Sequence, residues 1–149
     1  MDATEGLRKT FRDVPACRIA TVGAKGAPHV ATRWFVWLEE GLYVATRQGD
    51  LTWKNALLEP RVSVVIDRGR EWADLAGVRL FGPVTPIAVE QPELRGAMTA
   101  FHEKYRTFLA DDGFELLTAT VPALAFLHLG SGDIDTWDHR ANPSPAGLS

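Results

Sequence analysis

The sequence predicts a mainly β fold with one short and one long helix besides a short N-terminal one, in which about six mostly antiparallel strands close into a small barrel. Short runs rich in Val, Thr, Phe and Trp alternate with turns that contain Gly or Pro. The early runs are joined by turns rather than by helices, and such short connections join antiparallel neighbours. Closure into a barrel removes the exposed sheet edges that this arrangement otherwise leaves.

The first elements are a short helix at residues 7–11 and a strand at residues 18–22. The glycine-bracketed turn at residues 23–26 ends this strand. A dense run of Val, Thr, Trp and Phe at residues 28–38 then predicts a second strand that pairs back on the first.

A second hairpin and a short helix follow. Residues 39–41, which end in Gly41, supply a turn before a strand at residues 42–46. Asp50 is placed to cap a helix through Leu58, which must stop before Pro60 because proline disfavours helical geometry at the preceding residue.

The next strands bracket a polar loop at residues 68–71. Residues 62–67 have little polar alternation, so we expect a strand buried on both faces. Residues 77–81 and 84–87 read as one strand with a bulge or bend at Gly82 and Pro83, where these residue types are tolerated.

A long helix is predicted after Pro92, which suits a first helical turn. Its apolar positions recur at three- and four-residue steps: Leu94, Ala97, Met98, Phe101, Tyr105, Phe108 and Leu109. Residues 123–129 give the last strand. We expect one domain over residues 1–140 and a loose tail at residues 141–149, which hold two prolines, serine and glycine.

Composition narrows the class of protein. A chain of 149 residues with 46% hydrophobic and 23% charged residues suits one globular domain. A net charge of −3 and the lack of a basic run argue against nucleic-acid partners. No apolar run approaches the ~20 residues that span a bilayer, and no signal-peptide core is seen at the N-terminus. We therefore expect a cytoplasmic protein without a membrane partner, in which the single cysteine, Cys17, is a small buried residue.

Catalytic motifs are few. Ser63 lies inside an apolar strand and Ser131 lies between two glycines, so a nucleophilic serine has no support. The acids Asp133, Asp135 and Asp138 beside His139 are typical of a solvated loop, and we predict no metal site. The sequence has neither a G-x-G-x-x-G motif nor a P-loop.

Aromatic and basic residues gather in the first half of the chain. Of five tryptophans, Trp34 and Trp37 share a strand at odd spacing and therefore face opposite sides. Both can simply pack, which we favour, or one can face a planar ligand or a partner. Arg33, Arg47 and Lys54 lie near the start of the short helix, where an anion would find unpaired N–H groups. Surface ion pairs explain these charges about as well.

These pieces together resemble the pyridoxamine 5′-phosphate oxidase-like superfamily of split β-barrels, which includes flavin- and deazaflavin-dependent oxidoreductases. The resemblance covers about residues 17–81. It is carried by CRIATVGAKGAPHV, RWFVW, GLYVAT and KNALLEPRVSVVID, and by the N-x-L-x-x-x-P-R-V-S pattern from Asn55 to Ser63.

The resemblance implies a homodimer with a cofactor at the subunit interface and a small-molecule substrate. FMN is the first cofactor it suggests, with a deazaflavin coenzyme or haem as alternatives. Arg33 matches the arginine that opens the second strand in FMN-binding members, and Thr46 matches the threonine that closes the third. The implied cofactor-binding residues are Arg33, Trp34, Phe35, Val36, Thr46, Arg47, Thr52, Lys54, Trp137 and Arg140. Of these, Trp34 to Val36 would line the ring through their backbone, and Trp137 with Arg140 would come from the other subunit.

One departure from the family concerns the phosphate clamp. Where the family has a serine followed by an Arg-Lys pair, this chain has Asp50, Leu51 and Thr52. An acid there repels a phosphate, increasingly as water is excluded. Either Arg47 and Lys54 supply the charge instead, which we favour, or the pocket takes another ligand, or the barrel has lost its cofactor.

Three functions follow from these alternatives. The first is a flavin- or deazaflavin-dependent oxidoreductase that acts on a small molecule and needs no catalytic side chain, because the cofactor does the redox chemistry. The second is a non-catalytic flavin- or haem-binding protein, for which His29, His102, His128 and His139 are the candidate iron ligands. The third is a structural dimer without a ligand.

Overall fold

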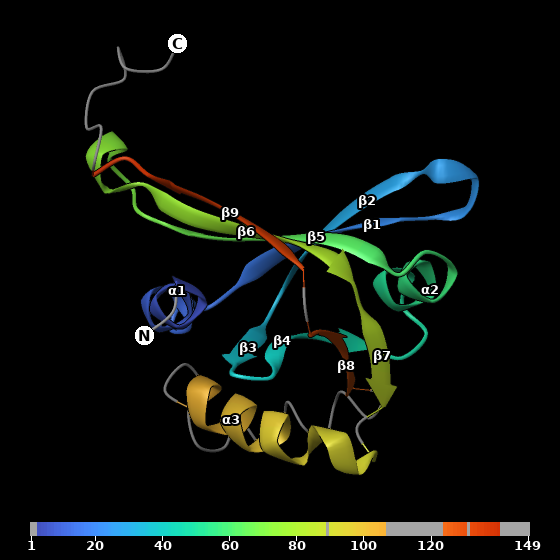
Figure 1. The fold of residues 1–149 in the computed structure, drawn as a ribbon. Coiled ribbons are helices and arrows are strands. Elements are labelled where there is room, and N and C mark those ends of the chain that lie inside the picture. The colour runs from blue at the N-terminus through green and yellow to red at the C-terminus, as the bar shows by residue number, and fades with distance from the viewer. Residues whose placement is uncertain (1–2, 89, 107–123, 131, 141–149) are drawn as a thin grey trace.

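The computed structural model describes residues 3–88, 90–106, 124–130 and 132–140. In these ranges the chain forms nine strands in two antiparallel sheets, together with three α-helices (Figure 1). This confirms the mainly β, split-barrel class, although the strands outnumber the six or so that the sequence predicts.

The five-stranded sheet has the order β2 (Pro28–Arg33), β1 (Cys17–Val22), β5 (Arg61–Arg68), β6 (Ala76–Pro83) and β9 (Asp133–Asp138). The four-stranded sheet has the order β3 (Phe35–Leu38), β4 (Gly41–Arg47), β8 (Leu124–Leu129) and β7 (Thr85–Ala88). The helices are α1 (Ala3–Phe11), α2 (Leu51–Leu58) and α3 (Arg95–Tyr105). Short 3-10 turns lie at Ala24–Gly26, Trp72–Asp74 and Pro92–Leu94.

Two runs predicted as single strands are each divided between the sheets. The run at residues 28–38 breaks at Trp34 into β2 and β3, and the run at residues 77–87 breaks at Val84 into β6 and β7. At the second corner the N–H of Val84 donates to the carbonyl of Pro60 at 2.9 Å. Strand propensity is continuous across the corner at Trp34, which therefore leaves no mark in composition. The corner at Val84 follows directly on Gly82 and Pro83, where the sequence predicts a bend.

The structure contradicts the expectation that residues 133–138 form a solvated loop. They form β9, which pairs with β6 from Asp133 opposite Phe81 to Asp138 opposite Ala76. Asp135 forms an exposed ion pair with Arg79 on the neighbouring strand. Charged side chains are usual on an edge strand, because they discourage pairing with a further chain.

Strand β5 also differs from its prediction. Val62, Val64 and Ile66 are buried, whereas Ser63, Val65 and Asp67 on the other face are partly exposed. The strand therefore has one core face and one half-covered face, as is common in antiparallel sheets.

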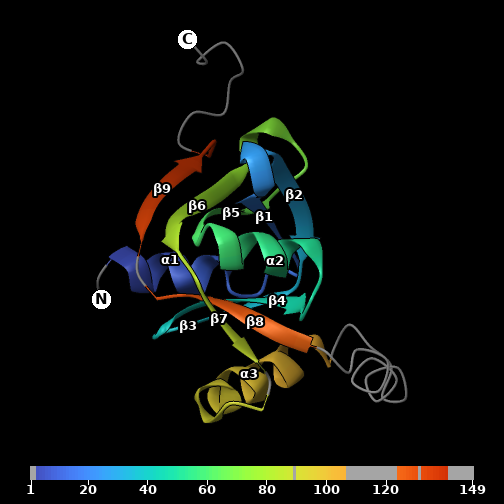
Figure 2. The same ribbon diagram turned by 90° about the vertical axis from the view of Figure 1, so that its right-hand side faces the viewer.

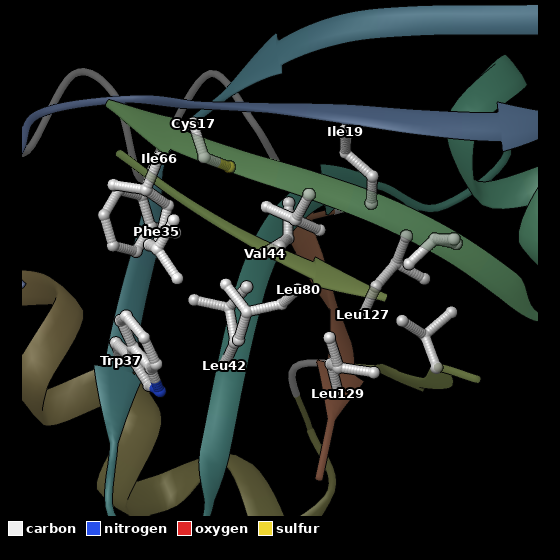
Figure 3. Close-up of a cluster of buried hydrophobic side chains, with 14 of the residues drawn as sticks. Cys17, Ile19, Phe35, Trp37, Leu42, Val44, Ile66, Leu80, Leu127 and Leu129 are labelled. Carbon is white, nitrogen blue, oxygen red and sulfur yellow. The ribbon is translucent and has the colours of Figure 1, made fainter. Parts of the chain in front are cut away.

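The main core lies between the two sheets, with α1 and α2 at opposite sides of the gap (Figures 1 and 2). Figure 3 shows Ile19, Ile66 and Leu80 from the five-stranded sheet facing Leu42 and Leu127 from the other. Cys17 is fully buried there, and burial raises the pKa of its thiol to about 12. A thiol held in its neutral form is inert, which agrees with the packing role predicted for it.

A second cluster joins the outer face of the four-stranded sheet to α3 (Figure 2). Trp34 stacks on Tyr105 with ring centroids 4.2 Å apart, while Trp37 packs in the main core. Both tryptophans pack on opposite sides, as favoured from the sequence. The Tyr105 hydroxyl accepts from the N–H of Phe35 at 2.8 Å and lies 2.9 Å from the carbonyl of Pro15.

The helix ends differ in detail from the predicted ones. α1 begins at Ala3, earlier than expected, and α3 begins at Arg95 after the turn at Pro92–Leu94. Phe108, Leu109 and the tail at residues 141–149 lie outside the described residues. Among the residues that the structure describes, no helix is both long and apolar enough to cross a membrane.

Candidate functional site

The candidate site is centred on Asp50, which caps α2 as the sequence predicts. Its backbone is extended, and its Oδ1 accepts from the N–H of Trp53 at 2.8 Å. Gly49, just before it, has a φ of 94°, a left-handed conformation that glycine adopts without strain. The chain can therefore turn sharply from β4 into α2 and place the Asp50 carboxylate at the helix N-terminus.

Three further groups converge on the same carboxylate. The Thr46 hydroxyl lies 2.9 and 3.0 Å from its two oxygens, and Arg33 Nη2 donates to Oδ2 at 3.2 Å. The N–H of Arg47 donates to Oδ2 at 3.3 Å. We call these donors, namely the Arg33 and Thr46 side chains with the N–H groups of Arg47 and Trp53, the Asp50 cradle.

The cradle keeps Asp50 ionised. Burial by itself would raise the pKa of the carboxyl group, but the hydrogen bonds from Trp53, Thr46 and Arg47 and the charge of Arg33 together lower it below its ordinary value. The cradle is therefore an anion-binding geometry, and the anion it holds is the chain's own carboxylate.

Two more side chains extend the cradle toward β2. Arg33 Nη2 donates to Thr52 Oγ1 at 3.1 Å, and His29 Nε2 lies 3.4 Å from the same oxygen. Thr52 is fully buried, whereas His29 and Arg33 are half-buried. Of the predicted residues, the structure thus brings Arg33, Thr46 and Thr52 together around Asp50.

From the sequence, Asp50 is a helix cap and a departure from the family's phosphate clamp, and nothing local marks it as the centre of the site. The sequence offers His29 only as a candidate iron ligand. Its even spacing from Arg33 along one strand places both on the same face, which is a signal that was available. The meeting of β2 with β4 and α2 depends on sheet register, for which the sequence gives no short-range signal.

The comparisons with known proteins agree with the split-barrel fold. The model of the pyridoxamine 5′-phosphate oxidase family matches residues 3–128. The chain belongs to this family. No curated protein matched the sequence.

Solved structures share the fold of this family member at low identity. The haem storage protein HutZ of Vibrio cholerae is 14% identical with a TM-score of 0.72, covering 94% of this chain and 99% of its own. A pyridoxamine 5′-phosphate oxidase-related, FMN-binding protein of Nostoc punctiforme is 17% identical with a TM-score of 0.65, and the match covers 96% of this chain and 87% of that protein. An F420 reductase is 18% identical with a TM-score of 0.63, and the match covers 85% of this chain and 94% of that protein.

The family pattern from Asn55 to Ser63 has a structural basis. Asn55 is buried, and its Nδ2 donates to Thr21 Oγ1 at 3.1 Å, which ties α2 to β1. A Cβ at Gly23 would lie only 3.0 Å from Asn55 Oδ1, so the turn after β1 approaches this side chain closely. The pattern therefore positions α2, and with it the Asp50 cradle, against the five-stranded sheet.

The other family-derived residues take several positions. Arg47 and Lys54 are exposed beside the cradle, one just before α2 and one in its first turn. The carbonyl of Trp34 accepts from the N–H of Ala45 at 2.8 Å. The carbonyl of Phe35 accepts from Lys104 Nζ at 2.9 Å, and Val36 packs against α3. The part assigned to Trp34, Phe35 and Val36 in lining a ring stays a prediction.

Trp137 and Arg140 lie far from the cradle within one chain. β9 is at the opposite edge of the five-stranded sheet from β2, which carries Arg33. Arg140 is hydrogen-bonded to Asp138, and Trp137 packs directly over Gly77. A second copy of the chain is needed to bring either residue to the cradle, as the family resemblance implies.

Two of the three acids of β9 pair with arginines, Asp135 with Arg79 and Asp138 with Arg140. The neighbouring His139 has its Nδ1 3.1 Å from the carbonyl of Trp72. Among the described residues no group of three or more His, Cys, Asp or Glu side chains is placed to hold a metal ion.

Proposed function

We propose that this member of the pyridoxamine 5′-phosphate oxidase family is a flavin- or deazaflavin-dependent oxidoreductase that acts on a small molecule. The observation that carries the proposal is the Asp50 cradle, in which Arg33, Thr46 and the start of α2 converge on one anion. The FMN-binding neighbour and the F420 reductase support it at the level of the fold.

The cradle fits a cofactor that approaches from its exposed side. A phosphate cannot take the Thr46 hydroxyl, the Arg33 Nη2 or the N–H groups that already bind Asp50. Two unit charges 4 Å apart repel by roughly 1 kcal/mol in water and 4 kcal/mol near a protein surface. Arg47 and Lys54 stand outside the buried donors on the solvent side. We assign the cofactor phosphate to these two residues together with the guanidinium of Arg33, which Asp50 and Thr52 hold in place through its Nη2.

The residues of the chain need only bind and orient the cofactor. The cofactor, when bound, supplies hydride transfer. Asp50 fixes the guanidinium of Arg33, and Thr46 fixes Asp50 in turn. Trp53, which is 9% exposed, packs its side chain in the main core and so anchors the start of α2. We therefore assign no catalytic side chain.

We further propose that the protein acts as a homodimer. Leu51, Leu57 and Leu58 of α2 are 54%, 60% and 69% exposed, and Val30 of β2 is 65% exposed. Apolar side chains gathered beside the site are typical of a surface covered by a partner. A second copy would cover them and would be needed to supply Trp137 and Arg140.

Titration of the freshly purified protein tests the proposal. FMN and an F420-type deazaflavin are added in turn while cofactor absorbance and tryptophan fluorescence are followed. Because the backbone N–H of Trp53 donates to Asp50 and its indole is therefore close to the proposed site, we expect saturable quenching by one of the two. No saturable change with either cofactor up to millimolar concentration would refute the proposal.

Haem binding is the second candidate, favoured by the position of His29. Its ring lies beside the cradle, whereas His128 stacks on Tyr43 and His139 packs against Trp72. Imidazole is a common axial ligand of haem iron. A Soret band on addition of haem that disappears in His29→Ala, but not in His139→Ala, would support this candidate over the flavin one.

A further inference from the structure

A cavity of about 260 Å³ lies between helix α1 and one end of the main core, and we call it the α1 cavity. Thr4 and Arg8 of α1 form one wall. The rest of the lining comes from the β3–β4 hairpin and from residues of β6, β8 and β9. The α1 cavity shares no lining residue with the Asp50 cradle, so a ligand here is separate from the proposed cofactor.

The floor of the α1 cavity is hydrocarbon. Trp37, Leu80 and Leu129 are buried members of the main core, and Ile134 of β9 packs against them. Such a floor favours a ligand that removes hydrocarbon surface from water. The volume equals that of about eight or nine water molecules, which suits a ligand of about eight non-hydrogen atoms.

Arg8 is the cation of the α1 cavity. It lies four residues after Thr4 and therefore on the same face of α1. Arg8 is half-buried, yet its guanidinium has no ion pair or hydrogen bond with any residue that the structure describes. Glu5, the acid of the same helix, pairs instead with Lys9 at 3.4 Å. Arg8 can therefore bind an anion without breaking an existing ion pair.

Trp37 supplies a second donor. Its ring is buried, but the indole N–H meets no acceptor in the part of the chain that the structure describes. Figure 3 shows the indole nitrogen at the end of the ring away from Phe35, and Leu129 lies at that same end of the cluster. A buried tryptophan N–H usually has an acceptor, and a ligand oxygen in the α1 cavity would provide one.

The chemistry of this lining selects the kind of ligand. Guanidinium and indole N–H groups donate and cannot accept, so the polar end of the ligand must be an acceptor. The other polar side chains of the lining, Thr4 and Glu39, are exposed. One arginine with one solvated carboxylate on the same rim favours a single negative charge over a double one. A carboxylate meets both conditions and matches the planar fork of a guanidinium.

We propose that the α1 cavity is a binding site for a short-chain aliphatic monocarboxylate of about the size of hexanoate. The carboxylate binds to Arg8, and the hydrocarbon chain lies against Leu80, Leu129 and Ile134.

Calorimetric titration of the whole chain with hexanoate, hexanol and acetate tests the proposal. Hexanol keeps the hydrocarbon chain without the charge, and acetate keeps the charge without the chain. We expect saturable binding of hexanoate, and binding at least about tenfold weaker for each of the other two. No saturable binding of hexanoate at millimolar concentration, or equal affinity for hexanol, would overturn the proposal.

Two arginine variants locate the carboxylate. Arg8→Gln keeps a good helix former and removes the charge, so it should weaken hexanoate binding at least about tenfold and leave hexanol binding unchanged. Arg12→Gln is the matched control, because Arg12 is exposed just after α1 and does not line the α1 cavity. Melting temperatures check that both variants fold. An equal loss of hexanoate binding in the two variants would contradict the assignment.

Glu39→Gln separates a monocarboxylate from a ligand that also carries a cation. Glu39 is exposed, so removing its charge should leave hexanoate affinity equal or raise it up to about threefold. Weaker binding of hexanoate to Glu39→Gln would mean that the acid supports the ligand, and this result would also overturn the proposal.

Discussion

Replacing Asp50 by Asn should strengthen the binding of FMN but not that of riboflavin. Asparagine remains a good helix N-cap, so the change removes the charge while keeping the start of α2. The Asp50 carboxylate lies 3.2 Å from the guanidinium of Arg33, so a phosphate drawn to that arginine would lie about 5 Å from the carboxylate.

At about 5 Å, two unit charges repel by roughly 1 kcal/mol in water and 3 kcal/mol at a protein surface. Those energies correspond to a change in affinity of roughly 5- to 150-fold. The side chain of Asp50 is 25% exposed, which favours the lower part of this range. We therefore expect FMN to bind about tenfold more tightly to Asp50→Asn.

The assay is a fluorescence titration of wild-type protein and Asp50→Asn with FMN and with riboflavin, which lacks the phosphate. Asp135→Asn is a matched control, because Asp135 also pairs with an arginine but lies on the far edge strand. An equal gain for riboflavin, an equal gain in the control, or no gain for FMN would refute the electrostatic reasoning.

Three other predictions concern the frame around the site. Because the folded-state pKa of Asp50 is lowered, its contribution to stability is complete above its unfolded pKa of about 3.9 and is lost as pH falls through the folded value. The difference in unfolding free energy between wild type and Asp50→Asn should therefore stay constant from pH 7 to about 5 and change only below about pH 4 in urea titrations. Tyr105→Phe should lower the unfolding free energy by about 1–3 kcal/mol, because it leaves the buried N–H of Phe35 without its hydroxyl acceptor; a loss equal to that of Tyr43→Phe would contradict this. Gly77→Ala should destabilise the protein, since the added Cβ would meet the Trp137 ring, whereas Gly6→Ala, with nothing near its Cβ, should not; equal melting temperatures for the two variants would contradict this.

Local signals predicted much of the frame of the site. The cap at Asp50 and the end of α2 before Pro60 follow from residue chemistry within a few positions, and the structure confirms both. The turn residues around Gly23 and Gly41 likewise predict two hairpins, which the structure shows as the β1–β2 and β3–β4 pairs. Each of these features is decided by neighbours in the chain, which is why a single sequence suffices for them.

Features set by distant contacts were not predictable in the same way. The break at Trp34 separates two strand-forming stretches, and the contact made at the break is with a distant residue, since Trp34 stacks on Tyr105 of α3. The acidic composition of residues 133–138 concealed an edge strand whose charges face solvent and Arg79. Likewise, the filling of the cradle by Asp50 depends on Arg33 and Thr46, which come from strands in different sheets.

The most direct test of the proposed cofactor site compares Arg33→Gln with Arg79→Gln in cofactor titrations. Both arginines lie on the five-stranded sheet and pair with an aspartate, but only Arg33 lies at the cradle. A charge-assisted hydrogen bond contributes about 1.5–3 kcal/mol, so Arg33→Gln should weaken binding of the preferred cofactor by at least about tenfold. Arg79→Gln should bind as the wild type does. Equal affinity for the cofactor in both variants would contradict the assignment of the site.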